Sequence, residues 1–224
     1  MVYNLFPFAS MRTRVKICGI TRPEDARAAV RCGADAIGLV FHPASPRFVR
    51  LEDARAVAMA VPAYVTIVGL FVDAAVAEVE RALEHVPLTL LQFHGQESNE
   101  SCRRYGVPFT KAVRMAKGVD VNSALLAYPD ARGFLLDTFV AGIAGGTGQV
   151  FDWGVIPQNL NAPIILAGGL TAQNVGNAVL RVRPYAVDVS GGVEIAKGIK
   201  DAKRIEEFIL AVQTADEVVA GLSS

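Results

Sequence analysis

The chain has 224 residues, of which 52% are hydrophobic and 20% charged, and this apolar content predicts one domain with a large core. Lysine and arginine together number 22, as do aspartate and glutamate, so no net charge attracts the chain to nucleic acid or to an anionic membrane. No stretch reaches the roughly 18 consecutive apolar residues of a membrane span. We therefore expect no nucleic-acid or membrane partner, and an anionic ligand has to be held locally.

The cysteines indicate the compartment. Cys18, Cys32 and Cys102 are odd in number and form neither a CxxC pair nor a metal-type cluster with histidine, which predicts a reduced, cytoplasmic protein without a metal site. The first ten residues lack the basic segment and the small-residue cleavage site of a signal peptide. We expect residues 1–13 to be a peripheral N-terminal extension and residues 14–224 to form the catalytic domain.

The segment 15–21 (VKICGIT) predicts a short buried strand that ends near a thiol and leads into a helix. Thr21 and Glu24 fit a capping box for that helix, and Pro23 suits its first turn. A side chain at the end of a strand, close to a helix N-terminus, lies where α/β folds build active sites. Free cysteine is also among the most buried residue types, so an inert core thiol at Cys18 is the alternative.

Seven further strand patterns follow, with helical or loop segments between them. The strands are expected at residues 34–41, 64–72, 88–93, 109–114, 133–136, 163–167 and 185–189. Asp73 and Thr171 are placed to cap helices, and the last helix carries Ile205, Phe208 and Val212 on one face. Eight strand and helix units with near-continuous apolar strands predict an α/β fold, a single (β/α)8 TIM barrel.

Glycines gather after the last strands of this predicted barrel. Gly168 and Gly169 follow the seventh strand, and Ser190, Gly191 and Gly192 follow the eighth, with residues 193–194 able to begin a short helix. In such barrels these two loops commonly hold a phosphate, because glycine lets backbone N–H groups point at the anion. Either glycine pair alone is explained by a tight turn. Both pairs together predict a phosphate site and a small phosphorylated ligand.

Other strand ends supply groups for chemistry. Asp137 ends the sixth strand, where it either caps a turn or works with Cys18 as an acid and base pair for proton transfer next to a carbonyl or imine carbon. Arg47, after the second strand, is either an exposed surface residue or a bidentate partner for a planar carboxylate. His42 and His94 have no obvious partner, and we expect them to stabilise loops.

A thiol acts as a base only after it has lost its proton. The N-terminus of the following helix favours a thiolate at Cys18, and Lys16 is the one adjacent basic residue. Residues two apart on a strand point to the same face, so Lys16 and Cys18 share a face.

The motifs together are specific, although no single one would suffice. The chain resembles the phosphoribosylanthranilate isomerases of tryptophan biosynthesis, from about residue 14 to the last helix, in segments 15–21 (VKICGIT), 45–47 (SPR), 92–95 (QFHG), 145–148 (GGTG), 151–153 (FDW), 166–170 (LAGGL), 188–190 (DVS) and 192–194 (GVE). Two positions depart from the family pattern. Phe93 stands where leucine is usual, and Gly191 stands where a second serine is usual, which removes a hydroxyl near the expected phosphate.

The resemblance implies an aldose–ketose isomerase that carries out an Amadori rearrangement of N-(5'-phosphoribosyl)anthranilate without cofactor or metal. It implies that Asp137 is the general acid that protonates the furanose ring oxygen and that Cys18 is the general base that removes the proton on C2. It makes Arg47 the partner of the anthranilate carboxylate and the two glycine loops the phosphate cradle. The glycine-rich loop after Asp137 (Gly142, Gly145, Gly146 and Gly148) becomes a candidate lid.

Other readings stay open. The histidine-pathway isomerase runs the same chemistry with paired aspartates, which Cys18 does not match, although a dual-substrate isomerase serving both pathways is possible. Indole-glycerol-phosphate synthase relies on lysines and a glutamate that Lys16 and Lys111 alone do not reproduce. A non-catalytic phosphosugar-binding barrel would tolerate the loss of Cys18 or Asp137, and both are present. The sequence fits either a monomer or a homodimer.

Overall fold

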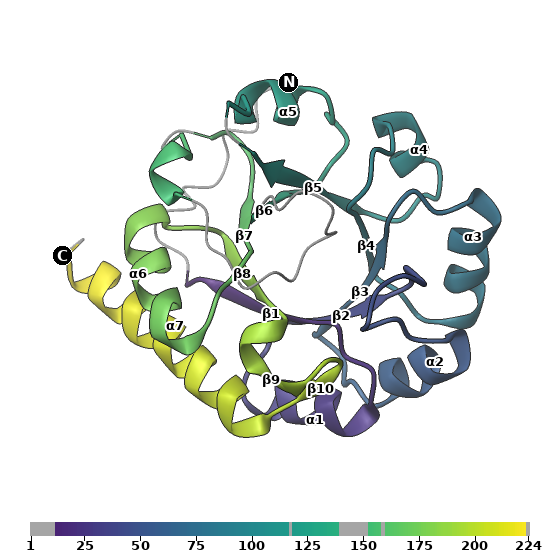
Figure 1. Cartoon of the computed structure of the whole chain (residues 1–224), viewed down its shortest axis with the longest axis horizontal. Coiled ribbons are helices and arrows are strands. Elements are labelled where there is room, and N and C mark those ends of the chain that lie inside the picture. The colour runs from purple at the N-terminus through teal and green to yellow at the C-terminus, as the bar shows by residue number, and fades with distance from the viewer. Residues whose placement is uncertain (1–11, 117, 139–151, 158–159, 223–224) are drawn as a thin grey trace.

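Eight parallel strands close into a barrel with helices around it (Figure 1). This computed structural model describes residues 12–116, 118–138, 152–157 and 160–222. Each strand pairs with its neighbours in chain order, and the last pairs with the first. The strands are β1 (Arg14–Cys18), β2 (Ala36–Val40), β3 (Thr66–Phe71), β4 (Leu90–Phe93), β5 (Phe109–Met115), β6 (Phe134–Thr138), β7 (Ile164–Leu166) and β8 (Ala186–Val189). The predicted TIM barrel is confirmed.

Helices connect the strands on the outside of the barrel. They are α1 (Pro23–Arg31), α2 (Leu51–Met59), α3 (Val76–His85), α4 (Asn99–Arg103), α5 (Val121–Leu126), α6 (Ala172–Val182) and α7 (Ala202–Leu222). Between β6 and β7 the described residues contain only a 3-10 turn, η2 (Trp153–Val155). After β8 come a second 3-10 turn, η3 (Gly191–Val193), and a small antiparallel hairpin of β9 (Glu194–Ala196) and β10 (Ile199–Lys200).

The strands separate two apolar regions, because successive side chains point to opposite faces. The main core lies between the strands and the helices and includes the fully buried Phe71, Phe109 and Phe208. Inside the barrel are two small clusters, formed by Cys18, Val40 and Leu70 and by Ala112, Leu135 and Ala167. With both faces covered, the strands read as near-continuous apolar runs.

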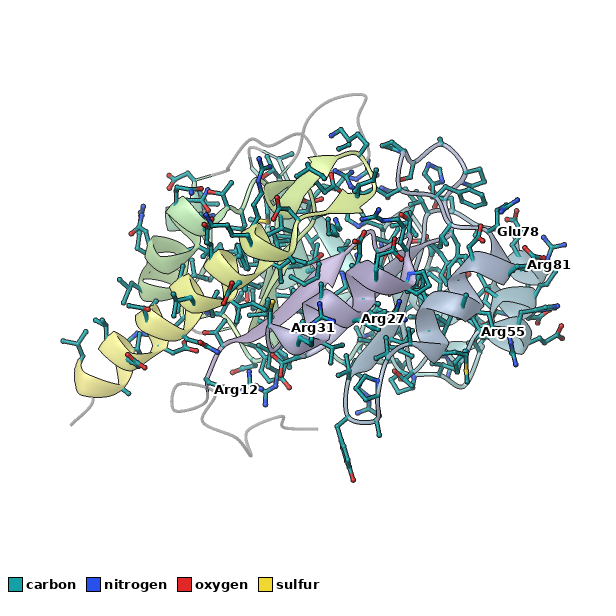
Figure 2. The ribbon with its side chains drawn as sticks, turned by 90° about the horizontal axis from the view of Figure 1, so that it is seen from below. Arg12, Arg27, Arg31, Arg55, Glu78 and Arg81 are labelled. Atoms are coloured by element: carbon teal, nitrogen blue, oxygen red, sulfur yellow. The ribbon has the colours of Figure 1, made fainter. Side chains whose placement is uncertain are left out.

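The helices turn their charged faces to solvent. Figure 2 shows Arg27 and Arg31 on α1, Arg55 on α2, and Glu78 and Arg81 on α3 pointing away from the barrel, and all five are exposed. The same helices bury small or branched residues against the strands, in the pattern of amphipathic helices of a globular protein.

The predicted capping box at Thr21 is wrong. The N-cap of α1 is Arg22, with no side-chain cap, and the hydroxyl of Thr21 donates instead to the carbonyl oxygen of Gly198 at 2.6 Å. This contact joins the start of α1 to the β9–β10 hairpin, which is 177 residues away in the sequence. The Thr21 hydroxyl group, which the local sequence pattern assigned to the N-cap of α1, therefore forms a tertiary hydrogen bond instead.

The predicted cap at Asp73 is also wrong. Helix α3 begins two residues later, after Ala75, whose N–H donates to the carboxylate of Glu78 at 2.8 Å. Asp73 itself lies in the left-handed region at φ 47° and accepts the N–H of Gln96 at 2.6 Å, so it stabilises the loop after β4. By contrast, Thr171 is the N-cap residue of α6, as predicted.

Most of the predicted N-terminal extension lies outside the described residues. Its last two residues are tied to the barrel: Arg12 pairs with Asp35, and the N–H and hydroxyl of Thr13 both donate to Asp216 at 2.7 Å. Within the described part of the chain, no helix is long and apolar enough to cross a membrane.

Candidate active site

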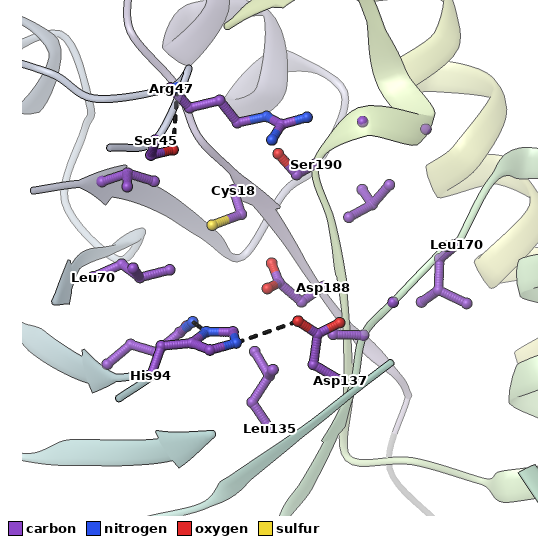
Figure 3. Close-up of a pocket in the computed structure, with 18 of the residues that line it drawn as sticks. Cys18, Ser45, Arg47, Leu70, His94, Leu135, Asp137, Leu170, Asp188 and Ser190 are labelled. Carbon is purple, nitrogen blue, oxygen red and sulfur yellow. Dashed lines mark hydrogen bonds and ion pairs between the residues drawn. The ribbon is translucent and has the colours of Figure 1, made fainter. Parts of the chain in front are cut away.

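A cavity of about 360 Å³ opens at the C-terminal ends of the barrel strands. Its lining contains all of the residues that the sequence analysis singled out as catalytic or substrate-binding, namely Cys18, Arg47, Asp137, Gly168, Gly169, Ser190, Gly191 and Gly192. Figure 3 shows Cys18 and Asp137 facing this cavity from different strands, with Arg47 and Ser190 at its edge. Parallel strands end on the same side of a barrel, which is why residues as far apart in sequence as Cys18 and Gly192 meet here.

Cys18 is the last residue of β1 and is 6% exposed. Burial raises the pKa of its thiol above the ordinary value, and the nearby positive charges of Lys16 and Lys200 oppose that rise. The carboxylate of Asp188 acts in the same direction as burial. The thiol thus lies among fixed charges at the floor of the cavity and is not enclosed by apolar groups alone.

Asp137 lies on β6 with a buried carboxyl group. Its Oδ1 accepts the backbone N–H of Thr138 at 2.9 Å, and its Oδ2 lies 3.2 Å from Nε2 of His94 (Figure 3). Nδ1 of that histidine is 3.4 Å from the amide nitrogen of Gln92. A chain of polar groups from β4 therefore ends at the carboxyl group of Asp137.

His94 is a site residue that the sequence analysis missed. We expected it to stabilise a loop without a partner, whereas its side chain lines the cavity against Asp137. Nε2 is buried against Oδ2 of Asp137 and is not aligned for a hydrogen bond to any acceptor within the described part of the chain. The available signal was spacing, since His94 follows Gln92 by two residues and so continues the inward face of β4. His42 also lines the cavity, and its carbonyl oxygen accepts the N–H of Ser45 at 2.9 Å.

Arg47 is buried and not an exposed surface residue. Its Nε and Nη2 donate to the two carboxylate oxygens of Glu194 at 2.7 and 2.8 Å, and Lys200 donates to the same carboxylate at 2.8 Å. Glu194 is therefore already a bidentate partner of the Arg47 guanidinium group. The third nitrogen, Nη1, has no acceptor among the residues that the structure describes. Glu194 fixes the guanidinium plane and leaves its Nη1 edge to a ligand.

The two glycine loops form one wall of the cavity. Gly168 and Gly169 have φ values of 84° and 64°, a conformation that favours glycine. Within the described ranges, the backbone N–H groups of Gly169, Gly191 and Gly192 donate to no protein acceptor. A Cβ at Gly192 would lie 2.1 Å from the carbonyl oxygen of Leu170, so the two loops pack too closely for a side chain there.

The short helix after β8 begins earlier than predicted. It is the 3-10 turn η3, which starts at Gly191, while Glu194 opens strand β9. The difference places the two free glycine N–H groups in the first turn of η3, whose N–H groups have no acceptor within the turn.

The candidate lid, with Gly142, Gly145, Gly146 and Gly148, lies outside the described residues. Among the residues that are described, no group of three or more histidine, cysteine, aspartate or glutamate side chains could hold a metal ion.

Comparison with known protein families gives a specific match. The model of the family described as N-(5'phosphoribosyl)anthranilate (PRA) isomerase matches residues 15–211. A protein of Pseudomonas fluorescens strain Pf-5 named N-(5'-phosphoribosyl)anthranilate isomerase is 59% identical over 204 residues, which cover 91% of this chain and 97% of that protein. A protein of the same name from Pseudomonas putida strain GB-1 is 58% identical over 202 residues, which cover 90% and 98% of the two chains.

Solved structures agree with the sequence relatives. The phosphoribosyl anthranilate isomerase of Thermotoga maritima superimposes with a TM-score of 0.83 at 39% identity, covering 90% of this chain and 99% of that one. A phosphoribosyl anthranilate isomerase solved in complex with reduced 1-(o-carboxyphenylamino)-1-deoxyribulose 5-phosphate superimposes with a TM-score of 0.80 at 39% identity and the same coverage. The chain described here therefore belongs to the N-(5'-phosphoribosyl)anthranilate isomerase family.

Proposed function

We propose that this chain converts N-(5'-phosphoribosyl)anthranilate into 1-(2-carboxyphenylamino)-1-deoxyribulose 5-phosphate, an aldose–ketose isomerisation in tryptophan biosynthesis, with Cys18 and Asp137 as its proton-transfer groups. The observation that carries the proposal is that a thiol and a carboxyl group face one cavity whose wall presents unused backbone N–H donors. The family match supports the substrate.

In the first step Asp137 acts as general acid. Its proton goes to the furanose ring oxygen as the bond between C1 and that oxygen breaks, and the lone pair of the anthranilate nitrogen forms the C1=N bond of a Schiff base. The bonding electrons stay on the oxygen, which leaves as a hydroxyl group. A carboxyl group placed at hydrogen-bonding distance of the leaving oxygen lowers the barrier to this step.

In the second step Cys18 acts as general base. The thiolate takes the proton from C2, the C–H electrons form a C1=C2 bond, and the C=N electrons return to nitrogen, which gives an enolamine. The enolamine then gains a proton at C1 and loses the proton of the C2 hydroxyl, which gives the ketone. C1 is reduced while C2 is oxidised, so the balance needs no outside electron carrier, in keeping with the prediction of no cofactor.

Two anionic groups of the substrate have candidate partners in the wall of the cavity. The N–H groups of Gly169, Gly191 and Gly192 suit the phosphate, and the free Nη1 edge of Arg47 suits the anthranilate carboxylate. A related phosphoribosyl anthranilate isomerase was solved in complex with reduced 1-(o-carboxyphenylamino)-1-deoxyribulose 5-phosphate, which carries both a phosphate and a carboxylate. We propose that this chain holds the corresponding groups in the same cavity.

The cysteines and the cavity suggest the setting of the reaction. All three cysteines are free, and a thiol that serves as base has to stay reduced, so we place the protein in the cytoplasm. The cavity fits a small phosphorylated substrate, and we expect the protein to be a monomer or a homodimer in solution, which sedimentation measures.

The test is the loss of phosphoribosylanthranilate fluorescence with the purified protein. Cys18→Ala and Asp137→Asn should abolish most turnover, whereas Cys32→Ala, which changes a thiol at the end of α1, should retain it. No turnover by the unaltered chain would refute the proposed activity. Equal turnover by Cys18→Ala and Cys32→Ala would instead remove Cys18 from the mechanism.

A further inference from the structure

Lys16 is a buried cation that the proposed reaction does not use. It lies on β1 two residues before Cys18, and its side chain is 9% exposed. Its Nζ donates to Oδ1 of Asp188 at 2.8 Å, and the register of the β1–β8 ladder places these two residues opposite each other. A lysine is rarely buried this deeply without a specific task or partner.

Lys16 also lies close to the thiol. Lys16 and Cys18 point to the same face of β1, and the positive charge of Lys16 acts on the Cys18 thiol. A Cβ added at Gly38, on the neighbouring strand, would lie 2.8 Å from Sγ of Cys18 and 3.2 Å from Cε of Lys16. Both side chains thus flank one point of β2, and the end of the Lys16 side chain that Asp188 holds lies on the same side of the sheet as the sulfur.

We propose that Lys16 is a positioning residue for the reaction: it supplies the positive charge that a thiolate at Cys18 requires in this buried place, and Asp188 holds the ammonium there. The proposal rests on the role of Cys18 as general base. Lys16 does not touch the reacting carbon and is not itself the base.

Lys16 acts on the pKa of the thiol more strongly than the other cations near it. The charged or titratable groups that face the site from the other elements are Asp188 on β8, His42 and Arg47 after β2, Lys197 and Lys200 in the β9–β10 hairpin, His94 after β4 and Asp137 on β6. Arg47 and Lys200 share the carboxylate of Glu194, which offsets part of their charge at the sulfur. Of the charges near Cys18, Lys16 lowers the pKa of the thiol most and so opposes the effect of burial. Asp188 raises this pKa.

Lys16 keeps its proton in this arrangement. Burial lowers the pKa of a lysine, but Asp188 and Cys18 outweigh it here, so the pKa of Lys16 is raised. The group remains an ammonium while the thiol loses and regains its proton. Lys16 therefore lowers the pKa of the thiol and Asp188 raises it. Substitutions of the two residues should shift this pKa in opposite directions, which makes the proposal testable.

The experiment is a pH titration of Cys18 alkylation by iodoacetamide in the full chain, with each labelled cysteine quantified by peptide mass spectrometry. Lys16→Met keeps the length of the side chain and removes its charge, and it should raise the midpoint for Cys18 by one pH unit or more, since one unit is a tenfold change in the thiolate equilibrium. Asp188→Asn should lower the midpoint. Lys16→Arg should lie closer to the unaltered chain than Lys16→Met does.

Two controls distinguish an effect of the Lys16 charge on Cys18 from a general disturbance of the fold. Cys32, at the end of α1, should keep its midpoint in every variant. Lys111→Met removes another buried lysine, whose Nζ donates to the carbonyl oxygen of Gly95 at 2.7 Å, and it should leave Cys18 unchanged. Equal shifts for Lys16→Met and Lys111→Met, or shifts of the same sign for Lys16→Met and Asp188→Asn, would overturn the proposal.

Folding and turnover are controlled separately. If Lys16→Met does not fold, Asp188→Asn carries the test, and a midpoint that does not fall in that variant overturns the proposal. The titration contains no substrate, so its result is distinct from a failure of the proposed activity. In the turnover assay, Lys16→Met should move the rising limb of the kcat profile to higher pH and leave KM nearly unchanged; a change in KM alone would contradict a role through the thiol.

Discussion

Nε2 of His94 lies 3.2 Å from Oδ2 of Asp137, and each side chain is 9% exposed. The imidazole contacts Oδ2 of the carboxyl group, and the N–H of Thr138 donates a hydrogen bond to Oδ1. We predict that His94→Ala lowers kcat by about 10- to 100-fold, because a small displacement of an acid costs that much. Steady-state kinetics measure the loss, and an unchanged kcat would show that Thr138 alone orients the acid.

Removing the acid itself should cost more. Asp137→Asn keeps the shape of the side chain and removes its transferable proton, so we predict a fall in kcat of about 10²- to 10⁴-fold with little change in KM. The variant should retain the circular dichroism spectrum of the unaltered chain. A KM that rises while kcat stays constant would assign Asp137 to binding and not to proton transfer.

The pH dependence should follow the thiol of Cys18. Burial raises its pKa above the ordinary 9.0, opposed by Lys16, so the free protein carries mainly the protonated thiol near neutral pH. The base form increases as pH rises, and we therefore predict that kcat/KM, which reports the free enzyme, climbs from pH 6 toward alkaline pH. A falling profile over this range would show that the limiting group has to be protonated.

Glu194 should matter for stability. Burial disfavours its charged form, but Arg47 and Lys200 outweigh burial and hold the pKa of the carboxyl group below its usual 4.5. Glu194→Gln leaves two cations facing each other, and we predict a loss of about 3–5 kcal/mol in the free energy of unfolding.

Denaturant titrations at several pH values check this prediction. The contribution of Glu194 is complete above its unfolded-state pKa and is lost as pH falls through its lower folded-state pKa. The difference between the unaltered chain and Glu194→Gln should therefore shrink below about pH 4.5. A difference that is constant with pH would indicate a change in packing and not in charge.

Gly168 offers a test of the loop after β7. Its φ is 84°, and a Cβ there would lie 2.2 Å from Oγ1 of Thr138 and 2.9 Å from Oδ1 of Asp137. Gly106, at φ 67° with nothing within 4 Å of such a Cβ, is the matched control. Both alanine variants should lose about 1–2 kcal/mol for the left-handed backbone. Only Gly168→Ala should also lose turnover, and equal turnover in both would contradict the clash at Asp137.

The sequence supported a prediction of the barrel because its strands are apolar on both faces and regularly spaced. Once a barrel is assumed, every strand end lies at one rim, so Cys18, Asp137 and the glycine loops had to meet around one cavity. This geometric rule explains why all the predicted site residues line it.

Apart from the cap at Asp73, the main differences arose where a contact joins residues far apart in the sequence. Thr21 has the right neighbours for a cap, but Gly198 takes its hydroxyl group. Glu194 meets Arg47 across 147 residues, and β4 and β6, which bring His94 to Asp137, are separated by β5. The spacing of neighbouring residues does not predict such pairs, because these contacts form only when the barrel closes and its loops pack against each other.

The ion pair between Lys16 and Asp188 joins the first strand of the ring to the last, across 172 residues of sequence. The environment of Cys18 is therefore complete only when β8 has docked against β1. A fragment that stops before β8, or a growing chain still on the ribosome, holds the thiol but lacks the carboxylate that anchors its ammonium neighbour. The reactivity of the Cys18 thiol therefore reports whether β8 has docked against β1 and the barrel has closed.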